Sequence, residues 1–435
     1  MYILIILLIS YMYQKQRQKT NEIYRYFTRG IFLKMMGAVS LCLIYTLYYG
    51  EGDTTNFFYH GGDILLNVFK RSPSDFFSIV FGERDSQHWN LFDQNTGWPY
   101  YYKDANSFFV VRIVSLCALF TFGSYIATAL LLTWICYSGV WRLYKVFADL
   151  YPQYSRQLAI AVLFLPSVMF WGSGILKDSI TFSAAGWYVY SFYKLFIKRE
   201  NVGRNTVTLL ISIYILLNVK AYIFYALMPG SLVWLSGFIT NSLRNPFLRF
   251  IFSPVLLISF LGLGYIILTQ LGAKQGRFSV DTLLQRAVIT QQDLKRSEQY
   301  GANFYDIGNF DASFASTLAK TPLAVFSALF RPLIWEVRNP FMMVSAIENI
   351  YFFWLLFQLF SKSKWKKIRG VIGRNPLIMF SLTFTLFFSF SVGLTSTNFG
   401  ALVRYRIPAL PFFVASLFLC TYLSREEPLT DKKKT

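Results

Sequence analysis

Acidic residues are scarce in this chain, and so are charged residues as a whole. Of its 435 residues, 22 are Asp or Glu and 42 are Lys or Arg, and the four types together make up 15%. A soluble protein carries about 25% charged residues. Hydrophobic residues make up 54% of the chain, and apolar runs of about 20 residues recur along its length, which is typical of a multi-pass membrane protein. We therefore expect no soluble domain of any size.

Cysteine is also rare. The chain has four, Cys42, Cys117, Cys136 and Cys420, and each lies inside an apolar run without metal-like spacing. We interpret them as small buried residues and expect no disulfides. The sequence likewise contains no phosphate-binding Walker loop, no haem or zinc spacing and no dinucleotide fingerprint. These absences exclude the common nucleotide-dependent and metal-dependent motifs.

The net charge of +20 suggests nucleic acid as a partner, but the distribution of the charge argues against it. Basic residues collect in short segments: "QKQRQK" (14–19), "RLYK" (142–145), "KRENVGR" (198–204), "RNPFLR" (244–249), "SKSKWKKIRGVIGR" (361–374) and the tail "DKKKT". Under the positive-inside rule these segments face the cytoplasm. We expect no nucleic-acid partner, and we expect the tail at 424–435 to be cytoplasmic.

The apolar runs predict ten or eleven membrane-spanning helices. A short run at 2–13 is followed, not preceded, by its charges, so we interpret it as a retained segment and not as a cleaved signal. The further spans are predicted at 31–49, 108–137, 157–173, 179–197, 205–219, 222–239, 247–269, 342–360, 376–393 and 406–423. The stretch 108–141 is either one long kinked helix or two short ones. A single membrane crossing by this stretch keeps every basic segment on the cytoplasmic side, so we predict a single crossing.

The expected architecture is therefore an all-α, polytopic transmembrane helical bundle, with residues 1–435 forming a single membrane domain. Two substantial loops face outward, at 50–107 and 270–341. We find no internal repeat of the kind that many transporters show.

The first outer loop begins "YYGEGDTTNFFYHGGDILLNVF" (48–69). Glu51 and Asp53 directly follow a helix that ends at the membrane interface, and Tyr59 and His60 follow on what is predicted to be an interfacial helix. A carboxylate in this position can act as a general base toward a hydroxyl nucleophile. The alternative is a solvated loop with a helix cap.

The segment "LPSVMFWGSGILKDSITF" (165–182) places Lys177 and Asp178 in the first turn of a helix. An acid there suits the helix dipole, and a lysine beside exposed N–H groups favours an anion such as phosphate. The alternative is a helical hairpin whose lysine extends to the interface. Lys220 interrupts an apolar stretch without an acid nearby in the sequence, and the same two interpretations apply to it.

The segment "LFRPLIWEVRNPFMMVSAIENIYFF" (329–353) contains several further charges. An ion pair of Glu336 with Arg331 or Arg338 would be structural, with Arg331 and Glu336 able to support a substrate site. Glu348 lies inside an apolar helix and so needs a partner.

Two arginines stand before the last apolar run, in "TSTNFGALVRYRIPALPFF" (395–413). Arginine offers planar, bidentate donors that match phosphate oxygens. Arg404 and Arg406 at the outer rim therefore favour phosphate binding, with Asn398 in a supporting position. The alternative is a pair of anchors in the outer leaflet, where positive charge is disfavoured.

These features resemble the GT-C superfamily of integral membrane glycosyltransferases. The resemblance rests on "GEGDTTNFFYHG", "LPSVMFWGSGILKDSI" and "NFGALVRYRIPALPFF", and it covers most of the chain in layout but only these motifs in residues. It implies inverting transfer of a sugar from a polyprenyl-phosphate donor to a glycan or lipid acceptor, on the outer face of the cytoplasmic membrane. Asp53 would be the base, or Glu51. Many members have adjacent acids, whereas Gly52 separates them here.

The resemblance also implies that Arg404, Arg406, Lys177 and Lys220 hold the lipid phosphate. No cofactor is required; a divalent metal would need Glu51, Asp53 and Asp178 to converge. One alternative is a polymerase or ligase that uses polyprenyl-diphosphate-linked oligosaccharides and relies on the large loop. The cations of that loop are Arg277, Arg286, Lys295 and Arg296. Another alternative is a flippase or transporter for lipid-linked sugars, which predicts charges deep in several spans.

Overall fold

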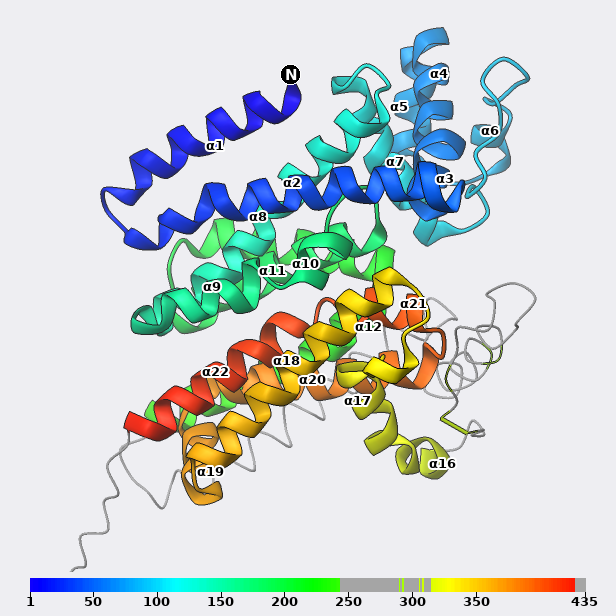
Figure 1. The fold of residues 1–435 in the computed structure, drawn as a ribbon. Coiled ribbons are helices and arrows are strands. Elements are labelled where there is room, and N and C mark those ends of the chain that lie inside the picture. The colour runs from blue at the N-terminus through cyan, green and yellow to red at the C-terminus, as the bar shows by residue number, and fades with distance from the viewer. Residues whose placement is uncertain (243–288, 290–291, 293–304, 306, 309–313, 427–435) are drawn as a thin grey trace, which may run out of the picture. The chain divides into compact units, whose positions relative to one another are not determined.

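The computed structural model describes residues 1–242, 289, 292, 305, 307–308 and 314–426. The described residues form helices and no β-strand, as Figure 1 shows. Among these described residues, five helices are long and apolar enough to cross a membrane, or six if one bent pair forms a single span. The prediction of a polytopic helical bundle is therefore confirmed. The five are Glu22–Tyr49, Tyr125–Leu150, Val202–Thr240, Met342–Ser361 and Pro376–Thr395, and the pair is Phe399–Tyr405 with Leu410–Glu426, bent by 63°.

This number is smaller than the ten or eleven predicted spans because several of the predicted spans are short, broken or merged. The predicted span at 247–269, most of the loop at 270–341 and the end of the tail lie outside the described residues. Contacts within the chain define two compact units, where the sequence predicted one domain. Unit 1 comprises Met1–Ser155, Leu163–Tyr193 and Glu200–Ala221; unit 2 comprises Arg156–Val162, Lys194–Arg199 and Tyr222–Thr435.

Unit 1 begins with two helices that pack side by side. They are α1 (Tyr2–Gln18) and α2 (Phe27–Ile44), joined through the 3₁₀ turn η1 (Glu22–Tyr26), and α2 continues into the π-helical turn η2 (Tyr45–Tyr49). The next helices form a small layer of their own: α3 (Asp53–Phe57), η3 (Phe58–Gly62), α4 (Asp63–Arg71), α5 (Pro73–Phe81), α6 (Ser86–Trp89) and α7 (Ala105–Phe120). Their apolar faces share one buried core, which includes Phe57, Phe76 and Val111.

The stretch 108–141 contains two helices, α7 and α8 (Tyr125–Leu150), and not one kinked helix. The chain turns between them at Phe122 and Gly123, both with positive φ. Only α8 is long and apolar enough to span. The Tyr125 hydroxyl lies 2.9 Å from the Thr54 hydroxyl, so α8 starts beside α3. The bounds 50–107 of the first outer loop stay a prediction.

The predicted span at 157–173 is also broken. Its residues form α9 (Ser155–Leu163), after the short turn η4 (Pro152–Tyr154), and then α10 (Pro166–Trp171). Leu165 is extended because a residue before proline avoids the helical conformation. The segment 179–197 forms α11 (Lys177–Phe192) and the π-helical turn η5 (Tyr193–Ile197).

The two spans predicted at 205–219 and 222–239 correspond to two helices that meet at a kink and together carry the label α12 (Val202–Ser242). Lys220 interrupts it with non-helical angles, φ −145° and ψ 80°. The residues before and after this break belong to different units. The sequence thus predicted the break and a helix on each side of it.

Besides most of α9 and the part of α12 that begins at Tyr222, unit 2 contains the remaining described helices. They are α16 (Phe314–Ala319), α17 (Thr321–Phe330), η6 (Ile334–Glu336), α18 (Pro340–Lys362), α19 (Trp365–Arg374), α20 (Pro376–Thr395), α21 (Phe399–Tyr405) and α22 (Leu410–Glu426). Aromatic rings fill the space between them: the ring centroids of Phe384 and Phe412 are 4.8 Å apart, and those of Phe330 and Phe353 are 4.6 Å apart.

Glycines allow the backbones of α8 and α11 to touch. A Cβ atom on Gly139 would lie 2.0 Å from the Ser183 carbonyl oxygen, and one on Gly186 would lie 2.2 Å from the Gly139 carbonyl oxygen. Small residues that bring helix backbones together are a common basis of packing in membranes, where apolar burial alone contributes little. This contact fixes α11, whose first residue is Lys177.

Replacing Gly139 or Gly186 by alanine should lower the thermal unfolding midpoint in detergent, because the added methyl group has to displace the partner backbone. Overpacking costs about 1–3 kcal/mol, more than the roughly 1 kcal/mol that alanine gains over glycine in a helix. Gly203→Ala in α12 is the matched control, since its Cβ would meet no atom within 4 Å. Its midpoint should hold or rise. Three equal midpoints would contradict the close packing.

Candidate active site

Asp53 is the first residue of the short helix α3, and its position is fixed by the residues around it. The Thr55 hydroxyl accepts a hydrogen bond from the Gly52 N–H at 2.9 Å and so caps the helix start. A side chain at Gly52 would collide with the ring of Tyr45, 2.3 Å from its Cβ position. Asp53 is half-buried, whereas Glu51 is exposed and precedes the helix. The two candidate bases therefore lie in different environments.

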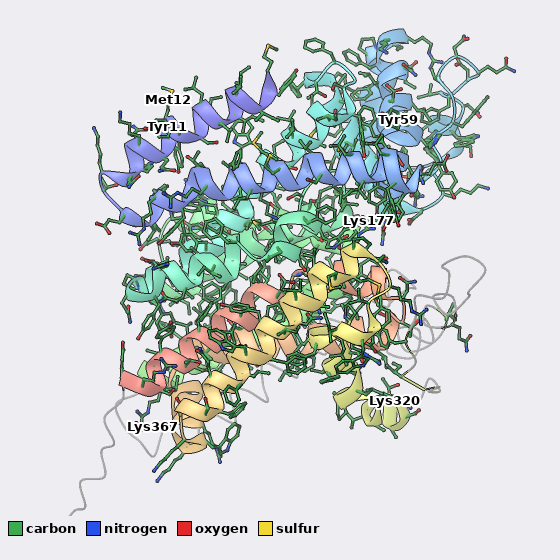
Figure 2. The ribbon with its side chains drawn as sticks, viewed as in Figure 1. Tyr11, Met12, Tyr59, Lys177, Lys320 and Lys367 are labelled. Carbon is green, nitrogen blue, oxygen red and sulfur yellow. The ribbon has the colours of Figure 1, made fainter. Side chains whose placement is uncertain are left out.

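Lys177, the first residue of α11, lies beside two acids of the first loop. Its ammonium is 3.5 Å from the carboxylate of Asp104, which caps the N-terminus of α7. Burial lowers the pKa of the Lys177 amine below its usual value, although the negative charges of Asp104 and Asp53 oppose the shift. Lys177 keeps about a fifth of its side chain exposed (21%), so a ligand can reach it. Figure 2 places Lys177 at the end of unit 1 that carries α3.

Asp104 takes part in this site, and the sequence analysis missed it. Burial alone would raise the pKa of its carboxyl group, but a hydrogen bond from the Ser107 hydroxyl and the charge of Lys177 hold that pKa below its usual value. The helix-start pattern "DANS" at 104–107, directly before an apolar run, could have identified Asp104.

Lys220 has an acidic partner that lies 42 residues away in the sequence. Its ammonium is 2.5 Å from the carboxylate of Asp178, which follows Lys177 on α11. Both side chains are buried, with 9% of Lys220 and 1% of Asp178 exposed. The pair joins the start of α11 to the break in α12. Lys220 is thus engaged by an acid, and Lys177 is the more accessible of the two lysines.

Together, five charged side chains from four elements gather in unit 1: Asp53, Asp104, Lys177, Asp178 and Lys220. The group contains the ion pairs of Lys177 with Asp104 and of Lys220 with Asp178, and the carboxyl group of Asp53. The arrangement combines a carboxylate able to accept a proton with a partly exposed ammonium able to bind an anion.

An apolar groove of about 240 Å³ begins within two turns of this group. Its lining is Ile113 of α7; Leu132, Ile135, Cys136 and Ser138 of α8; Ile180, Ser183, Ala184 and Trp187 of α11; and Thr208, Ile211, Ser212 and Ile215 of α12. Ile180 lies about 4.5 Å along α11 from Lys177, at 1.5 Å per residue. From Ile180 to Trp187 the groove follows α11 for about 10 Å. It provides an apolar surface along α11 whose nearest lining residue lies one turn from Lys177.

Tyr59 and His60 lie in the π-helical turn η3, and both side chains are exposed. The Tyr59 ring packs on Tyr125, with 5.3 Å between centroids, and the His60 carbonyl accepts a hydrogen bond from the Tyr100 N–H. These contacts organise the first loop. The metal site that would need Glu51, Asp53 and Asp178 is not seen: no group of three potential His, Cys, Asp or Glu ligands occurs among the described residues.

In unit 2, Arg331 pairs with Glu336 at 2.5 Å, one of the two pairings that the sequence left open. The Arg331 guanidinium also lies over the ring of Tyr305, 4.8 Å from its centroid. Asn398 accepts hydrogen bonds from the N–H groups of Gly400 and Ala401 and so caps α21. These contacts stabilise the segment at 331–336 and the start of α21, which precede α22 in the chain.

Arg406 has a different environment from the exposed rim that the sequence predicted. It is fully buried, and its Nη1 donates to the carbonyl groups of Leu329 and Arg331, at 3.2 and 2.9 Å, at the end of α17. Its Nη2 lies 3.9 Å from the carboxylate of Glu348, which confirms that Glu348 has a partner. Arg404 is buried as well, with 8% exposed. The geometry gives Arg406 a structural role.

No known protein family, no curated protein and no solved structure matches this chain.

Breaking the buried pair should destabilise unit 1. Lys220→Met leaves the Asp178 carboxylate buried without this cation, and such a loss costs about 3–5 kcal/mol. Adding Asp178→Asn should recover most of the thermal midpoint, because the buried charge is gone. Lys177→Met is the control: 54% of its partner Asp104 is exposed and remains hydrated, so the cost should be about 1 kcal/mol or less. A double variant no more stable than Lys220→Met would contradict this account.

Proposed function

We propose that this chain is a membrane glycosyltransferase that moves a sugar from a polyprenyl-phosphate donor to a hydroxyl group of a glycan or lipid acceptor. The observation that carries the proposal is the group of Asp53, Asp104 and Lys177, with an apolar groove whose nearest lining residue on α11 lies one turn from Lys177. A lipid-linked sugar has the matching parts: an isoprenoid chain, a phosphate and a sugar, in that order.

In the proposed reaction Asp53 is the base. Its carboxylate accepts the proton of the acceptor hydroxyl while the hydroxyl oxygen forms a bond to the anomeric carbon. The bond between that carbon and the phosphate oxygen breaks, with inversion. The polyprenyl phosphate leaves as an anion, so its departure needs charge stabilisation and no acid. Lys177 supplies that charge, and Asp104 positions it.

The assignment of the phosphate to Lys177 follows from what the other candidate cations already bind. Lys220 is paired with a buried carboxylate, and the Nη1 of Arg406 is engaged by backbone carbonyl groups. Lys177 is held by a partly exposed carboxylate and is itself accessible. A phosphate can therefore share or replace the contact with Asp104 without leaving a buried charge unpaired.

The distribution of charge in unit 1 supports an outward-facing site in the cytoplasmic membrane. Arg142 and Lys145 lie near the far end of α8, where the Lys145 ammonium is 3.4 Å from the Tyr24 hydroxyl. Tyr125, beside the candidate site, lies 20 residues or about 30 Å away along α8, close to the thickness of the hydrocarbon core. With the basic end on the cytoplasmic side, the site lies at the outer surface.

The first test is release of polyprenyl phosphate from a panel of lipid-linked sugars by the protein purified in detergent. Asp53→Asn should reduce kcat at least 100-fold, the typical contribution of a general base. Asp63→Asn is the matched control, because Asp63 is another acid of the first loop that starts α4. If Asp53→Asn retains full activity and Glu51→Gln loses it, the base is Glu51. If neither acid matters, the transferase mechanism is wrong, and a polymerase or a flippase takes its place.

The groove makes a separate prediction about the isoprenoid chain. Ile211→Trp should raise KM about tenfold for a long-chain donor and leave a short-chain donor unchanged, because the added ring fills the groove and removes binding common to the ground and transition states. Leu210→Trp is the matched control: the two residues are adjacent on α12 and similarly exposed, but only Ile211 lines the groove. Equal effects of the two variants, or equal effects on both donors, would show that the isoprenoid chain binds outside this groove.

A further inference from the structure

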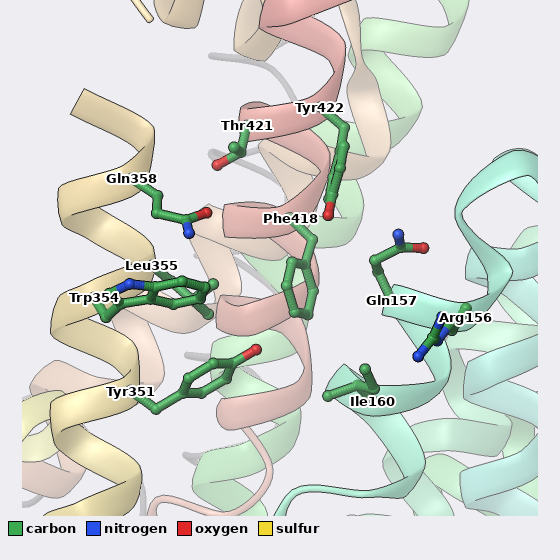
Figure 3. A pocket seen from close by; sticks show the side chains of 10 residues that line it. All are labelled: Arg156, Gln157, Ile160, Tyr351, Trp354, Leu355, Gln358, Phe418, Thr421 and Tyr422. Atoms are coloured by element: carbon green, nitrogen blue, oxygen red, sulfur yellow. The ribbon is translucent and has the colours of Figure 1, made fainter. Parts of the chain in front are cut away.

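Unit 2 contains a second cavity, of about 300 Å³. Three helices form it, as Figure 3 shows. Its lining residues are Arg156, Gln157 and Ile160 of α9, Tyr351, Trp354, Leu355 and Gln358 of α18, and Phe418, Thr421 and Tyr422 of α22. On each helix these positions are spaced by about one turn, so each helix turns one face to the cavity. The cavity is therefore built from regular secondary structure.

The polar groups of this cavity are mostly donors. Arg156 offers a guanidinium group, and Gln157 and Gln358 each offer an amide NH₂. Among the described residues, no Asp or Glu lines the cavity, so no carboxylate there would attract a cation or an amine. This set of groups favours an anion with several acceptor oxygens.

Arg156 is available to such an anion. Its side chain is exposed, and within the part of the chain that the structure describes no carboxylate lies within 4 Å of its guanidinium nitrogens. This distinguishes Arg156 from Arg331 and Arg406 of the same unit, which contact carboxylates. An arginine that lines a cavity and has no ion-pair partner is a candidate for binding a phosphate group.

The aromatic rings of the cavity fit a lipid better than a free ion. Tyr351 and Trp354 stack with 5.6 Å between centroids, and Trp354 is half exposed. Tyrosine and tryptophan gather at the depth of lipid headgroups, where one part of the ring is in an apolar environment and the other is hydrated. The ring faces would cover the glycerol region of a lipid whose phosphate reaches Arg156.

A neighbouring helix would concentrate anionic lipids near the cavity. Gln358 lies one turn before the end of α18, and the amphipathic helix α19 follows and packs against α22. Helix α19 buries Ile368 and Val371 and exposes Lys366 and Arg369. A basic amphipathic helix attracts anionic headgroups, by about 1 kcal/mol for each lysine or arginine near the surface.

We propose that this cavity binds the phosphate of an anionic membrane lipid, with Arg156 as its charge partner and Gln157 and Gln358 as neutral donors. The acyl chains extend over Leu355 and Phe418 toward the surrounding lipid. The site is separate from the group around Lys177 and does not depend on the transfer reaction.

The test compares lipid retention by the full chain in nanodiscs of phosphatidylcholine with one-fifth phosphatidylglycerol, released and weighed by native mass spectrometry. Wild type should retain phosphatidylglycerol in preference to phosphatidylcholine. Arg156→Gln should reduce that preference about tenfold, as expected for the loss of a charge-assisted hydrogen bond. Gln358→Leu should reduce it less, because a neutral donor is lost.

Arg199→Gln is the control, because it removes one exposed positive charge from unit 2 and lies neither in the cavity lining nor on α19. Its effect should be small. If it lowers the preference as much as Arg156→Gln does, the binding is a general surface attraction and the site is wrong. If inorganic phosphate alone raises the thermal midpoint in detergent, and Arg156→Gln abolishes the rise, the site binds a free anion from solution. The proposal that its ligand is a lipid is then wrong. Equal lipid retention by all variants would overturn the proposal.

Discussion

The pairing of Asp178 with Lys220 is the interaction on which the arrangement of unit 1 depends. Neither group could be buried alone, because an isolated charge in an apolar interior costs many kcal/mol. Their pairing lets α12 break at Lys220 and brings that break against the start of α11. Lys177 precedes Asp178 in the chain, so its position next to Asp104 follows from the same contact. The buried Asp178–Lys220 pair thus positions the partly exposed Lys177–Asp104 pair.

Two other buried cations, Lys34 and Arg406, donate hydrogen bonds to carbonyl groups at the ends of helices. Lys34, near the middle of α2, donates to the carbonyl groups of Val168 and Gly172 at the end of α10, at 2.9 and 2.7 Å. Arg406 does the same for the end of α17. Short or interrupted helices leave carbonyl groups without partners, which is costly where water is absent. These cations satisfy them, and the chain can place helix ends inside its apolar core.

The fold class could be predicted from the sequence because composition and apolar run length decide it. Local breaks were partly visible, as Pro166 and Lys220 show. What could not be predicted was which charges meet, because Lys220 and Asp178 lie 42 residues apart and only packing brings them together. Asp53 and Lys177 were found as individual residues. The burial of Arg406 could not be predicted, because an arginine before an apolar run has the same sequence pattern whether it binds a phosphate or the carbonyl groups of a neighbouring helix.

The length of α8 between Tyr125 and Lys145 couples the candidate site to the membrane itself. Tyr125 is tied to α3 by a hydrogen bond to Thr54, and Lys145 is tied to Tyr24 at the far end. A helix anchored at both ends cannot change its length, so a thicker or thinner bilayer must deform or tilt the helix to match it. The depth of Asp53 relative to the lipid phosphates is then a function of bilayer thickness. Hydrophobic mismatch would thereby change the depth at which the candidate site meets the lipid headgroups.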